Sequence, residues 1–508
     1  TNGMGYHEYL QMCEDLKAEP LYVINSGVTS QSRRPRYEDI TAMNKLVQDA
    51  LDAIAYANAP VDSAFGAMRA KQGHPEPFNL KYVEIGSENY GQEYSKRFEL
   101  FLPIFNETYP EITVIKSSLI AGQNRTEWTD YHFYSGEDFL IANHNRYETG
   151  QYLRRFPAVF IGEFSMGDAS LQGTLRAAIG EACFLVGIEN SPEVVKRLAY
   201  APVLGNVDYE FQRYPALSFN NHQVVGSPSF YMMQMFANNR GDELLKTDVD
   251  TYSRPQVTFG RASIELFDNS YDFENVRIDD KPVTEGTVKS GGWQVDNGKL
   301  IPVPNRWNYL LMGDSTAHDY TLSMRVRRTK GSGQIQLRVR DNGKAGEAND
   351  HIALSIAPGS CELYRQAGTL SAPRIHSFES NRWYDIKIVC KDENISCYVD
   401  DTQIYEVELP PLPSLVSVAT MDKEANVILL KVVNTTQHEE KTELNIKGVS
   451  IKNDAEVIQL TGEPLGRNTF TEPEKIVPIQ KNISFSLGGP MVYSFPPNSI
   501  TIMKLHID

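Results

Sequence analysis

The chain lacks several features that mark other classes of protein. Only 5 of its 508 residues are cysteines, and their spacing matches neither a disulfide framework nor a zinc site, so buried free thiols are expected. No run of about 18 apolar residues occurs, so no membrane-spanning helix and no membrane partner are expected. The motifs of phosphate-binding loops, serine nucleophile elbows and HExxH zinc enzymes are also missing. No cofactor and no metal are therefore expected.

Positive charge is scarce as well. The chain has 49 Lys and Arg residues against 65 Asp and Glu residues, which gives a net charge of −16. A polyanionic nucleic-acid partner is disfavoured by this charge. The hydrophobic content of 41% is ordinary for a globular protein. The length allows about two to four domains.

Residues 1 to about 235 alternate strand-like and helix-like segments, which is typical of a parallel sheet. Six strands are expected, two short of a closed βα barrel. An open sheet would leave two long edges unpaired, so we expect a (β/α)8 TIM barrel whose first strands lie upstream of Thr1. Residues 192–200 are predicted to be helical. The strands are predicted at 20–25, 80–86, 112–116, 130–134, 158–163, and within 203–208 or 216–219.

Residues from 240 onward change to alternating polar and apolar runs. The runs 320–328 and 334–340 flank a Lys-Gly-Ser-Gly segment at 330–333, which is a hairpin signal. Many short strands at regular spacing predict β-sandwich domains. The fold class is therefore α/β followed by all-β.

Two glutamates, Glu88 and Glu163, each follow a short apolar run at a predicted strand end. In a βα barrel the carboxyl ends of the strands form the active-site face. Two carboxylates across one sugar can cut a glycosidic bond, one as nucleophile and one as acid/base. The alternative is that each glutamate is merely solvated or paired, which is common among 65 acidic residues. Glu84, on the strand before Glu88, is interpreted as a buried structural partner.

His132 and Tyr134 end another predicted strand. Such groups could orient a nucleophile or bind a sugar hydroxyl. The alternative is a core histidine with its hydrogen bonds satisfied and a packing tyrosine. The sequence pattern leaves both interpretations open.

Several segments together resemble one family, the α-L-arabinofuranosidases of glycoside hydrolase family 51, which are retaining TIM-barrel enzymes. The resemblance covers residues 1–240 and about 412–508. The matching segments include 1–16, 82–89 (Tyr-Val-Glu-Ile-Gly-Ser-Glu-Asn), 130–134 (Asp-Tyr-His-Phe-Tyr), 159–164, 176–182, 200–202, 226–231 and 495–504.

The resemblance implies roles for five residues. Glu88 would be the general acid/base and Glu163 the nucleophile. Tyr134 would contact the sugar or the nucleophile, with His132 in support, and Asn25 would lie near the site. The implied activity is release of terminal α-L-arabinofuranosyl residues from plant polysaccharides such as arabinan or arabinoxylan. The implied partner is an arabinose-containing poly- or oligosaccharide, a homo-oligomer is compatible with the family, and a secreted or periplasmic location is expected.

The chain departs from the family at two places. The family has Asn immediately before the acid/base, where this chain has Ser87. That Asn binds the sugar 2-hydroxyl, a contact that strengthens in the transition state, so Ser87 predicts lower activity or an altered sugar preference. The family's first two strands and its Arg-Phe-Pro-Gly-Gly motif are also absent from the chain. Two alternatives stay open: another retaining barrel glycosidase, and a catalytically weakened carbohydrate-binding protein.

The resemblance also suggests domain limits. Residues 1–240 would be a partial TIM-barrel catalytic domain, and 241–264 with 412–508 a C-terminal β-sandwich. Residues 265–411 would be an inserted module similar to a concanavalin-like jelly roll, which could bind glycan or serve as a spacer. Trp293, Trp307 and Trp383 could be sugar platforms or core residues, and alternation favours the core for Trp383.

Overall fold

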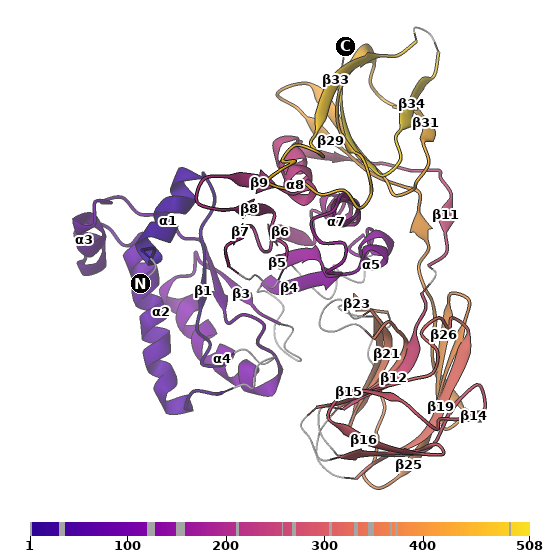
Figure 1. Cartoon of the computed structure of the whole chain (residues 1–508). Helices are drawn as coiled ribbons and strands as arrows, with labels where there is room; N and C mark the ends of the chain where they lie inside the picture. The colour runs from indigo at the N-terminus through magenta and orange to yellow at the C-terminus, as the bar shows by residue number, and fades with distance from the viewer. Residues whose placement is uncertain are drawn as a thin grey trace. The chain divides into compact units, whose positions relative to one another are not determined.

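The chain divides into two compact units, and Figure 1 shows its helices and strands. The first holds Thr1–His132, Tyr147–Glu163 and Ser191–Ala199, and the second holds Phe133–Arg146, Phe164–Asn190 and Tyr200–Asp508. The structure is a computed structural model. It describes residues 3–29, 36–118, 128–148, 158–209, 213–256, 258–266, 271–303, 307–329, 334–343, 350–365, 368–370, 374–486 and 489–507.

Within the described residues, one sheet runs through the N-terminal half in the order β1-β2-β3-β4-β5-β6. Strands β1 to β4 pair in parallel, as the alternation of strand and helix predicts. The architecture is therefore a parallel TIM-like sheet followed by antiparallel sandwiches, and closure into an eight-stranded barrel stays a prediction. The strands are β1 (Leu21–Ile24), β2 (Tyr82–Ile85), β3 (Thr113–Lys116), β4 (Trp128–Ser135), β5 (Val159–Met166) and β6 (Val195–Tyr200).

The prediction of a helix over 192–200 is wrong. Pro192 and the charged residues after it look like a helix start, but β6 occupies 195–200. Pairing beside β5 outweighs the local preference: the backbone N–H of Val159 donates to the carbonyl of Val194. The two segments proposed for the last strand instead form β7 (Leu204–Asn206) and β8 (Leu217–Phe219), which make a separate small sheet with β9 (Val224–Gly226).

Helices follow most of the sheet strands. In the first unit, α1, α2 and α4 bury their apolar faces against β1 to β3 in one core, which includes Leu10, Val47, Ile54, Ile85 and Phe98. The helix α3 was not predicted from the sequence. The helices are α1 (Tyr6–Asp15), η2 (Ile40–Ala42), α2 (Met43–Asn58), α3 (Ala64–Lys71), α4 (Gly91–Thr108), α5 (Glu137–Ala142), α7 (Leu175–Glu189) and α8 (Pro228–Asn238).

Helix α7 is apolar on nearly all sides and almost wholly buried. It contacts α5 and α8 and also β29 (Leu415–Asp422) and β30 (Val427–Asn434) of the C-terminal sheet. A helix covered on every side is expected to be hydrophobic all round. Among the described residues no helix is both long and apolar enough to cross a membrane, and each of the described cysteines is free.

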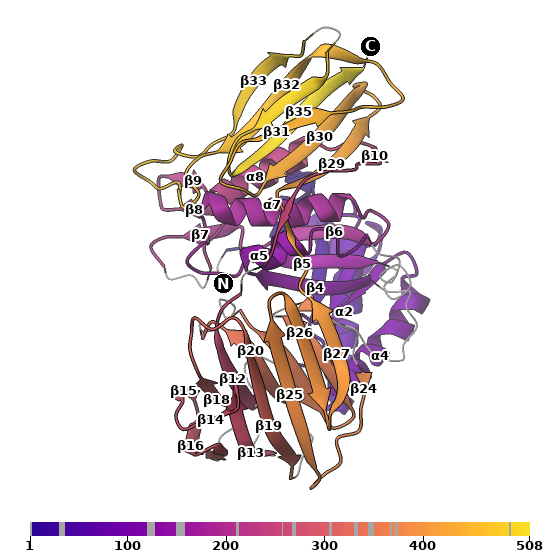
Figure 2. The same ribbon diagram turned by 90° about the vertical axis from the view of Figure 1, so that its right-hand side faces the viewer.

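The middle of the chain forms a sandwich of antiparallel sheets around one apolar core (Figure 2). Its first sheet runs β15 (Thr287–Ser290), β18 (Asn308–Met312), β12 (Arg261–Leu266), β20 (Ile335–Asp341), β21 (Ile352–Ala357), β22 (Ser360–Arg365) and β23 (Gly368–Thr369), with β24 (Arg374–Ile375) on β22. The second runs β16 (Gly292–Asp296), β17 (Lys299–Val303), β13 (Tyr271–Ile278), β19 (Tyr320–Arg328), β25 (Trp383–Lys391), β26 (Asn394–Val399) and β27 (Thr402–Glu408), with β14 (Lys281–Pro282) on β13.

The hairpin predicted at 330–333 is wrong in its pairing, although both flanking strands exist. Strand β19 lies between β13 and β25, whereas β20 lies between β12 and β21 in the other sheet. In both strands the apolar residues stand at every second position and belong to the shared core, so the connection crosses from one sheet to the other. Residues 330–333 themselves lie outside the described residues.

The core position predicted for Trp383 is also wrong. The residues of β25 that face the core begin one position later, at Tyr384. The Trp383 ring lies on the opposite face of the sheet, where the guanidinium carbons of Arg325 and Arg327 lie 5.1 Å and 4.6 Å from its centre. A one-residue shift in register moves a side chain to the other face of a strand.

The other two tryptophans of the module differ from each other. Trp293 packs against the core, whereas Trp307 is exposed. Trp307 donates from its indole N–H to Glu265 at 2.5 Å. Whether the module binds glycan stays an open prediction.

The last part of the chain forms another antiparallel sandwich. Near the limits of the predicted insertion, β11 (Ser253–Arg254) pairs with β28 (Leu412–Pro413), so the chain enters and leaves the module side by side. The domain limits stay a prediction, but β12 pairs with module strands from Arg261, upstream of the expected limit at 265. The main sheet runs β10 (Glu243–Leu245), β29, β30, β35 (Ser499–Ile507), β32 (Ile451–Thr461) and β33 (Ile479–Ser484), and β31 (Glu440–Leu444) pairs with β34 (Met491–Phe495).

Candidate active site

A tight turn after β2 presents the first glutamate. Gly86 has φ +80°, and a Cβ added there would lie 2.5 Å from Asn89 Oδ1, so the turn requires glycine. Glu88 itself has φ +52°, a left-handed conformation that is uncommon for a residue with a side chain. The Ser26 hydroxyl at the end of β1 donates to Asn89 Oδ1 at 2.7 Å and ties the turn to the next strand. Strain of this kind is often found at functional sites.

Strand β4 presents Asp130 and His132 on one face, because alternate residues of a strand point the same way. Asp130 is only 4% exposed. Its Oδ2 lies 2.8 Å from His132 Nε2, and its Oδ1 accepts from the backbone N–H of Gly162 at 2.7 Å. Asp130 therefore connects β4 to the residue directly before Glu163 on β5.

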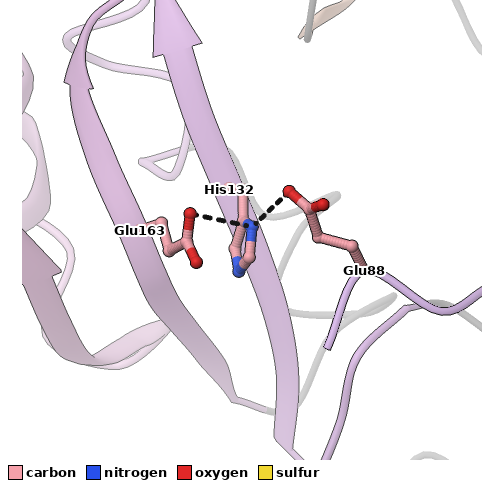
Figure 3. Close-up of side chains that lie close together, drawn as sticks. All are labelled: Glu88, His132 and Glu163. Carbon is pink, nitrogen blue, oxygen red and sulfur yellow. Dashed lines mark hydrogen bonds and ion pairs between the residues drawn. The ribbon is translucent and has the colours of Figure 1, made fainter. Parts of the chain in front are cut away.

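The two glutamates meet at the imidazole of His132 (Figure 3). His132 Nδ1 lies 3.1 Å from Glu88 Oε1 and 3.5 Å from Glu163 Oε2. Facing oxygens of the two carboxylates lie within 4.8 Å of each other. The structure thus brings together the three residues that the sequence analysis placed at separate strand ends.

Burial and charge shift the pKa values of two groups in this cluster. Burial alone would lower the pKa of His132, but hydrogen bonds with Asp130 and Glu88 outweigh it and raise the pKa to about 10. Burial, and then the charge of Asp130 and a hydrogen bond with it, raise the pKa of Glu84 to about 9. Near neutral pH Glu84 is therefore neutral and His132 carries a proton. This agrees with the interpretation of Glu84 as a buried structural partner.

These shifts predict that the protein loses stability as the pH rises. The pKa of Glu84 is near 4.5 in the unfolded chain and about 9 in the folded protein. Its contribution to the free energy of unfolding is therefore complete below about pH 4.5 and is lost as the pH rises towards about 9. His132 adds a loss between about pH 6.5 and about pH 10. Glutamine keeps a donor but cannot ionise. Glu84→Gln should therefore be more stable than the parent by roughly 1–3 kcal/mol at about pH 8 in urea denaturation.

The same comparison near pH 5 is the control, because Glu84 is then neutral in the folded state of the parent as well. The stabilities of the parent and the variant should converge there. Parallel stability curves from about pH 5 to about pH 9 would contradict a protonated Glu84.

A cavity of about 430 Å³ opens beside these groups. Hydroxyl, aromatic and carboxylate groups in one hollow suit a polyhydroxylated ligand. The sequence analysis missed Asp130 and the aromatic lining, although the spacing of two between Asp130 and His132 on a strand was a usable signal. The lining residues are Glu88, Tyr90, Ser117, Ser118, Asp130, Tyr131 and His132.

The other predicted site residues have different surroundings. Ser87 is exposed and directly precedes Glu88. Asn25 is exposed at the end of β1, and its Oδ1 accepts from the backbone N–H of Gly27 at 2.8 Å. Tyr134 belongs to the second unit, where the guanidinium carbon of Arg213 lies 3.4 Å from its ring centre. Sugar contacts of these three residues stay predictions.

Glu88, His132 and Glu163 also offer one ligand atom each within 4.8 Å, a spacing that a cation could bridge. A histidine must be neutral to ligate a metal. With its pKa near 10 and Nε2 held by Asp130, His132 keeps its protons near neutral pH. The donor chemistry of the cluster therefore suits proton transfer better than metal binding.

Two family models match the chain. The one described as "Alpha-L-arabinofuranosidase 1 domain" matches residues 1–153, and the one described as "Alpha-L-arabinofuranosidase C-terminal domain" matches residues 162–499. The second match alone spans more than half of the chain.

Curated relatives carry related names. An extracellular exo-α-L-arabinofuranosidase of Streptomyces chartreusis is 28% identical over 553 aligned positions, covering 99% of this chain and 64% of the relative. The α-L-arabinofuranosidase 1 of Arabidopsis thaliana is 31% identical over 281 positions, covering 54% of this chain and 40% of the relative. The chain thus spans less than two thirds of the length of either relative.

Solved structures share the fold. The arabinose-bound MgGH51 α-L-arabinofuranosidase aligns with a TM-score of 0.58 at 17% identity, over 99% of this chain and 57% of that chain. The arabinose complex of the α-L-arabinofuranosidase from Thermotoga maritima aligns with a TM-score of 0.56 at 15% identity, over 99% of this chain and 79% of that chain. At such identities the likeness concerns the fold.

Proposed function

Because the chain belongs to the α-L-arabinofuranosidase family, we propose that it is a retaining glycoside hydrolase that releases terminal α-L-arabinofuranosyl residues. Family membership agrees with the resemblance found in the sequence. The proposed substrates are arabinose-containing polysaccharides such as arabinan or arabinoxylan. A location outside the cytoplasm, as in the name of the Streptomyces relative, is part of the proposal.

The meeting of two carboxylates at one imidazole carries the proposal. Facing oxygens of Glu88 and Glu163 lie within 4.8 Å. Retaining glycosidases place their carboxyl groups about 5–5.5 Å apart, whereas inverting enzymes need about 6.5–9.5 Å to admit a water. The spacing supports a double-displacement mechanism.

In that mechanism Glu163 attacks the anomeric carbon while Glu88 protonates the departing glycosidic oxygen. The covalent arabinosyl-enzyme is then hydrolysed by a water that Glu88 deprotonates. His132 Nδ1 contacts both carboxylates, so it can hold the nucleophile in place and share the proton of the acid. The order of roles follows the family resemblance, with Glu88 before Glu163 along the chain.

The test is hydrolysis of 4-nitrophenyl α-L-arabinofuranoside by the 508-residue chain and by a version extended upstream. We expect release of 4-nitrophenol, with α-L-arabinose as the first anomer seen by proton NMR. Release of the β-anomer first would contradict retention. Preference for another aryl glycoside would favour a different retaining barrel glycosidase. Binding of arabino-oligosaccharides without turnover would favour a carbohydrate-binding protein.

Ser87 gives a further prediction about activity. Its side chain is shorter than that of asparagine and has no amide to donate to the sugar 2-hydroxyl, where a contact strengthens in the transition state. Ser87→Asn should therefore raise kcat on 4-nitrophenyl α-L-arabinofuranoside by roughly 10-fold. Ser87 is exposed, so the melting temperature should stay unchanged and serves as the control. An unchanged kcat on every furanoside tested would refute the assigned role of this position.

A further inference from the structure

Asp130 is buried and contacts both His132, which faces the two glutamates, and the backbone next to Glu163. One carboxylate oxygen holds the His132 ring, whose other nitrogen faces Glu88 and Glu163. The second oxygen accepts from the backbone N–H of Gly162, the residue directly before Glu163. A single buried side chain thus fixes a ring on β4 and the backbone of β5.

The backbone of β5 at Gly162 leaves room for the Asp130 carboxylate. A Cβ added to Gly162 would lie 2.5 Å from Asp130 Oδ1 and 2.9 Å from Cγ. Such contacts are far below van der Waals distance, so only glycine lets the carboxylate reach the amide. The close approach shows that the contact is built into β5 rather than made by a mobile side chain.

Glu84 completes the arrangement from β2. Its side chain is 3% exposed, and the Asp130 carboxylate lies close enough to raise the pKa of Glu84 by charge and by hydrogen bonding. Two buried carboxyl groups in contact cannot both be ionised at low cost, and Asp130 already accepts from His132 and Gly162. Glu84 is therefore the protonated partner that donates to Asp130. Tyr94 of α4 also faces this pair, but its hydroxyl donates to the carbonyl of Ile85 at 2.7 Å.

We propose that Asp130, supported by Glu84, is a positioning residue that keeps the proton on His132 Nε2, orients the ring and fixes the place of both glutamates. The inference rests on the proposed glycosidase function. Since Asp130 holds Nε2–H, the ring must face the glutamates with Nδ1. That nitrogen can donate to Glu88 when Glu88 is ionised and accept from it when Glu88 is protonated. One proton is therefore shared across the 3.1 Å contact and is available to the departing oxygen.

Asp130→Asn tests this chemistry without changing size. An amide has one acceptor oxygen, so it cannot accept from both His132 Nε2 and Gly162. If its NH₂ turns to the ring, Nε2 must lose its proton and Nδ1 can no longer accept from Glu88. We expect kcat on 4-nitrophenyl α-L-arabinofuranoside to fall by about 10²–10³-fold, with KM changed by less than about 3-fold. The alkaline limb of the pH profile should move down by at least about one unit.

Asp62→Asn is the matched control, because it makes the same change from carboxylate to amide at an exposed position of the same unit. Its kcat should stay within about 3-fold of the parent. Nitrogen-15 NMR of labelled histidines supplies a readout that does not need turnover. The His132 signal, identified by its loss in His132→Gln, should titrate at least about one unit lower in Asp130→Asn than in the parent.

The outcomes separate the two proposals. An active parent whose Asp130→Asn form keeps its kcat, pH profile and His132 titration would overturn the positioning role. An Asp130→Asn form that is slower, with pH profile and titration unchanged, would also overturn it, because Asp130 would then be a structural residue. An inactive parent whose His132 titration still moves in Asp130→Asn would preserve the hydrogen-bond network and reject the glycosidase function.

Discussion

Glu163→Ala should lose kcat/KM on 4-nitrophenyl α-L-arabinofuranoside by about 10⁴-fold or more. The side chain is expected to form the covalent bond to the anomeric carbon, and His132 and Asp130 cannot replace that bond. The good leaving group, 4-nitrophenol, does not restore the rate, because the variant lacks the group that attacks the anomeric carbon. The protein should stay folded, since Glu163 is partly exposed.

Azide identifies the role that the removed carboxylate had. In Glu163→Ala the small anion can enter the vacated space and attack from the same face that the carboxylate used. The product should be β-L-arabinofuranosyl azide, with inverted configuration, and turnover should rise with azide concentration. Proton NMR of the product distinguishes the two configurations. An α-configured azide from this variant would refute the nucleophile assignment.

Glu88→Ala should show a loss that depends on the leaving group. A general acid contributes about 10²–10⁴-fold when the departing oxygen needs a proton. We therefore expect that loss on an arabino-oligosaccharide or an alkyl arabinofuranoside. On 4-nitrophenyl α-L-arabinofuranoside the first step needs little protonation, so the arabinosyl-enzyme should accumulate with a burst of 4-nitrophenol.

Azide again gives a distinct product. With Glu163 intact, azide in the space left by Glu88 attacks the arabinosyl-enzyme and yields α-L-arabinofuranosyl azide, with retained configuration. Glu107→Ala, an exposed glutamate on α4 of the same unit, is the matched control and should behave as the parent. Equal losses on all leaving groups would indicate that Glu88 is not the proton donor.

Much of the candidate site could be predicted from the sequence. Short apolar runs followed by glycine and glutamate indicate strand ends, and the carboxyl ends of parallel strands gather at one edge. That rule was sufficient to bring Glu88, His132 and Glu163 together, and the contacts at His132 Nδ1 agree with it. The spacing of Asp130 and His132 was visible too. However, nothing in the sequence distinguishes a buried aspartate that supports the site from one that is exposed to solvent.

Pairing partners could not be predicted from local patterns. The segment 192–200 begins like a helix, yet residues 195–200 form β6 because they pair with β5. The strands β19 and β20 look like a hairpin but belong to opposite sheets around one core. The Trp383 error has the same origin, since one residue of register decides the face of a strand.

The sequence by itself determined the strand–helix alternation, the change to β-sandwiches after about residue 240, and the residue types of the site, because periodicity and strand-end chemistry are local properties. The tertiary structure alone decided that Asp130 reaches both His132 and the Gly162 amide. It also decided that Glu84 keeps a proton beside Asp130 and that one imidazole nitrogen serves two glutamates. Those features depend on distances between strands that are remote in sequence, and on the burial that shifts their protons.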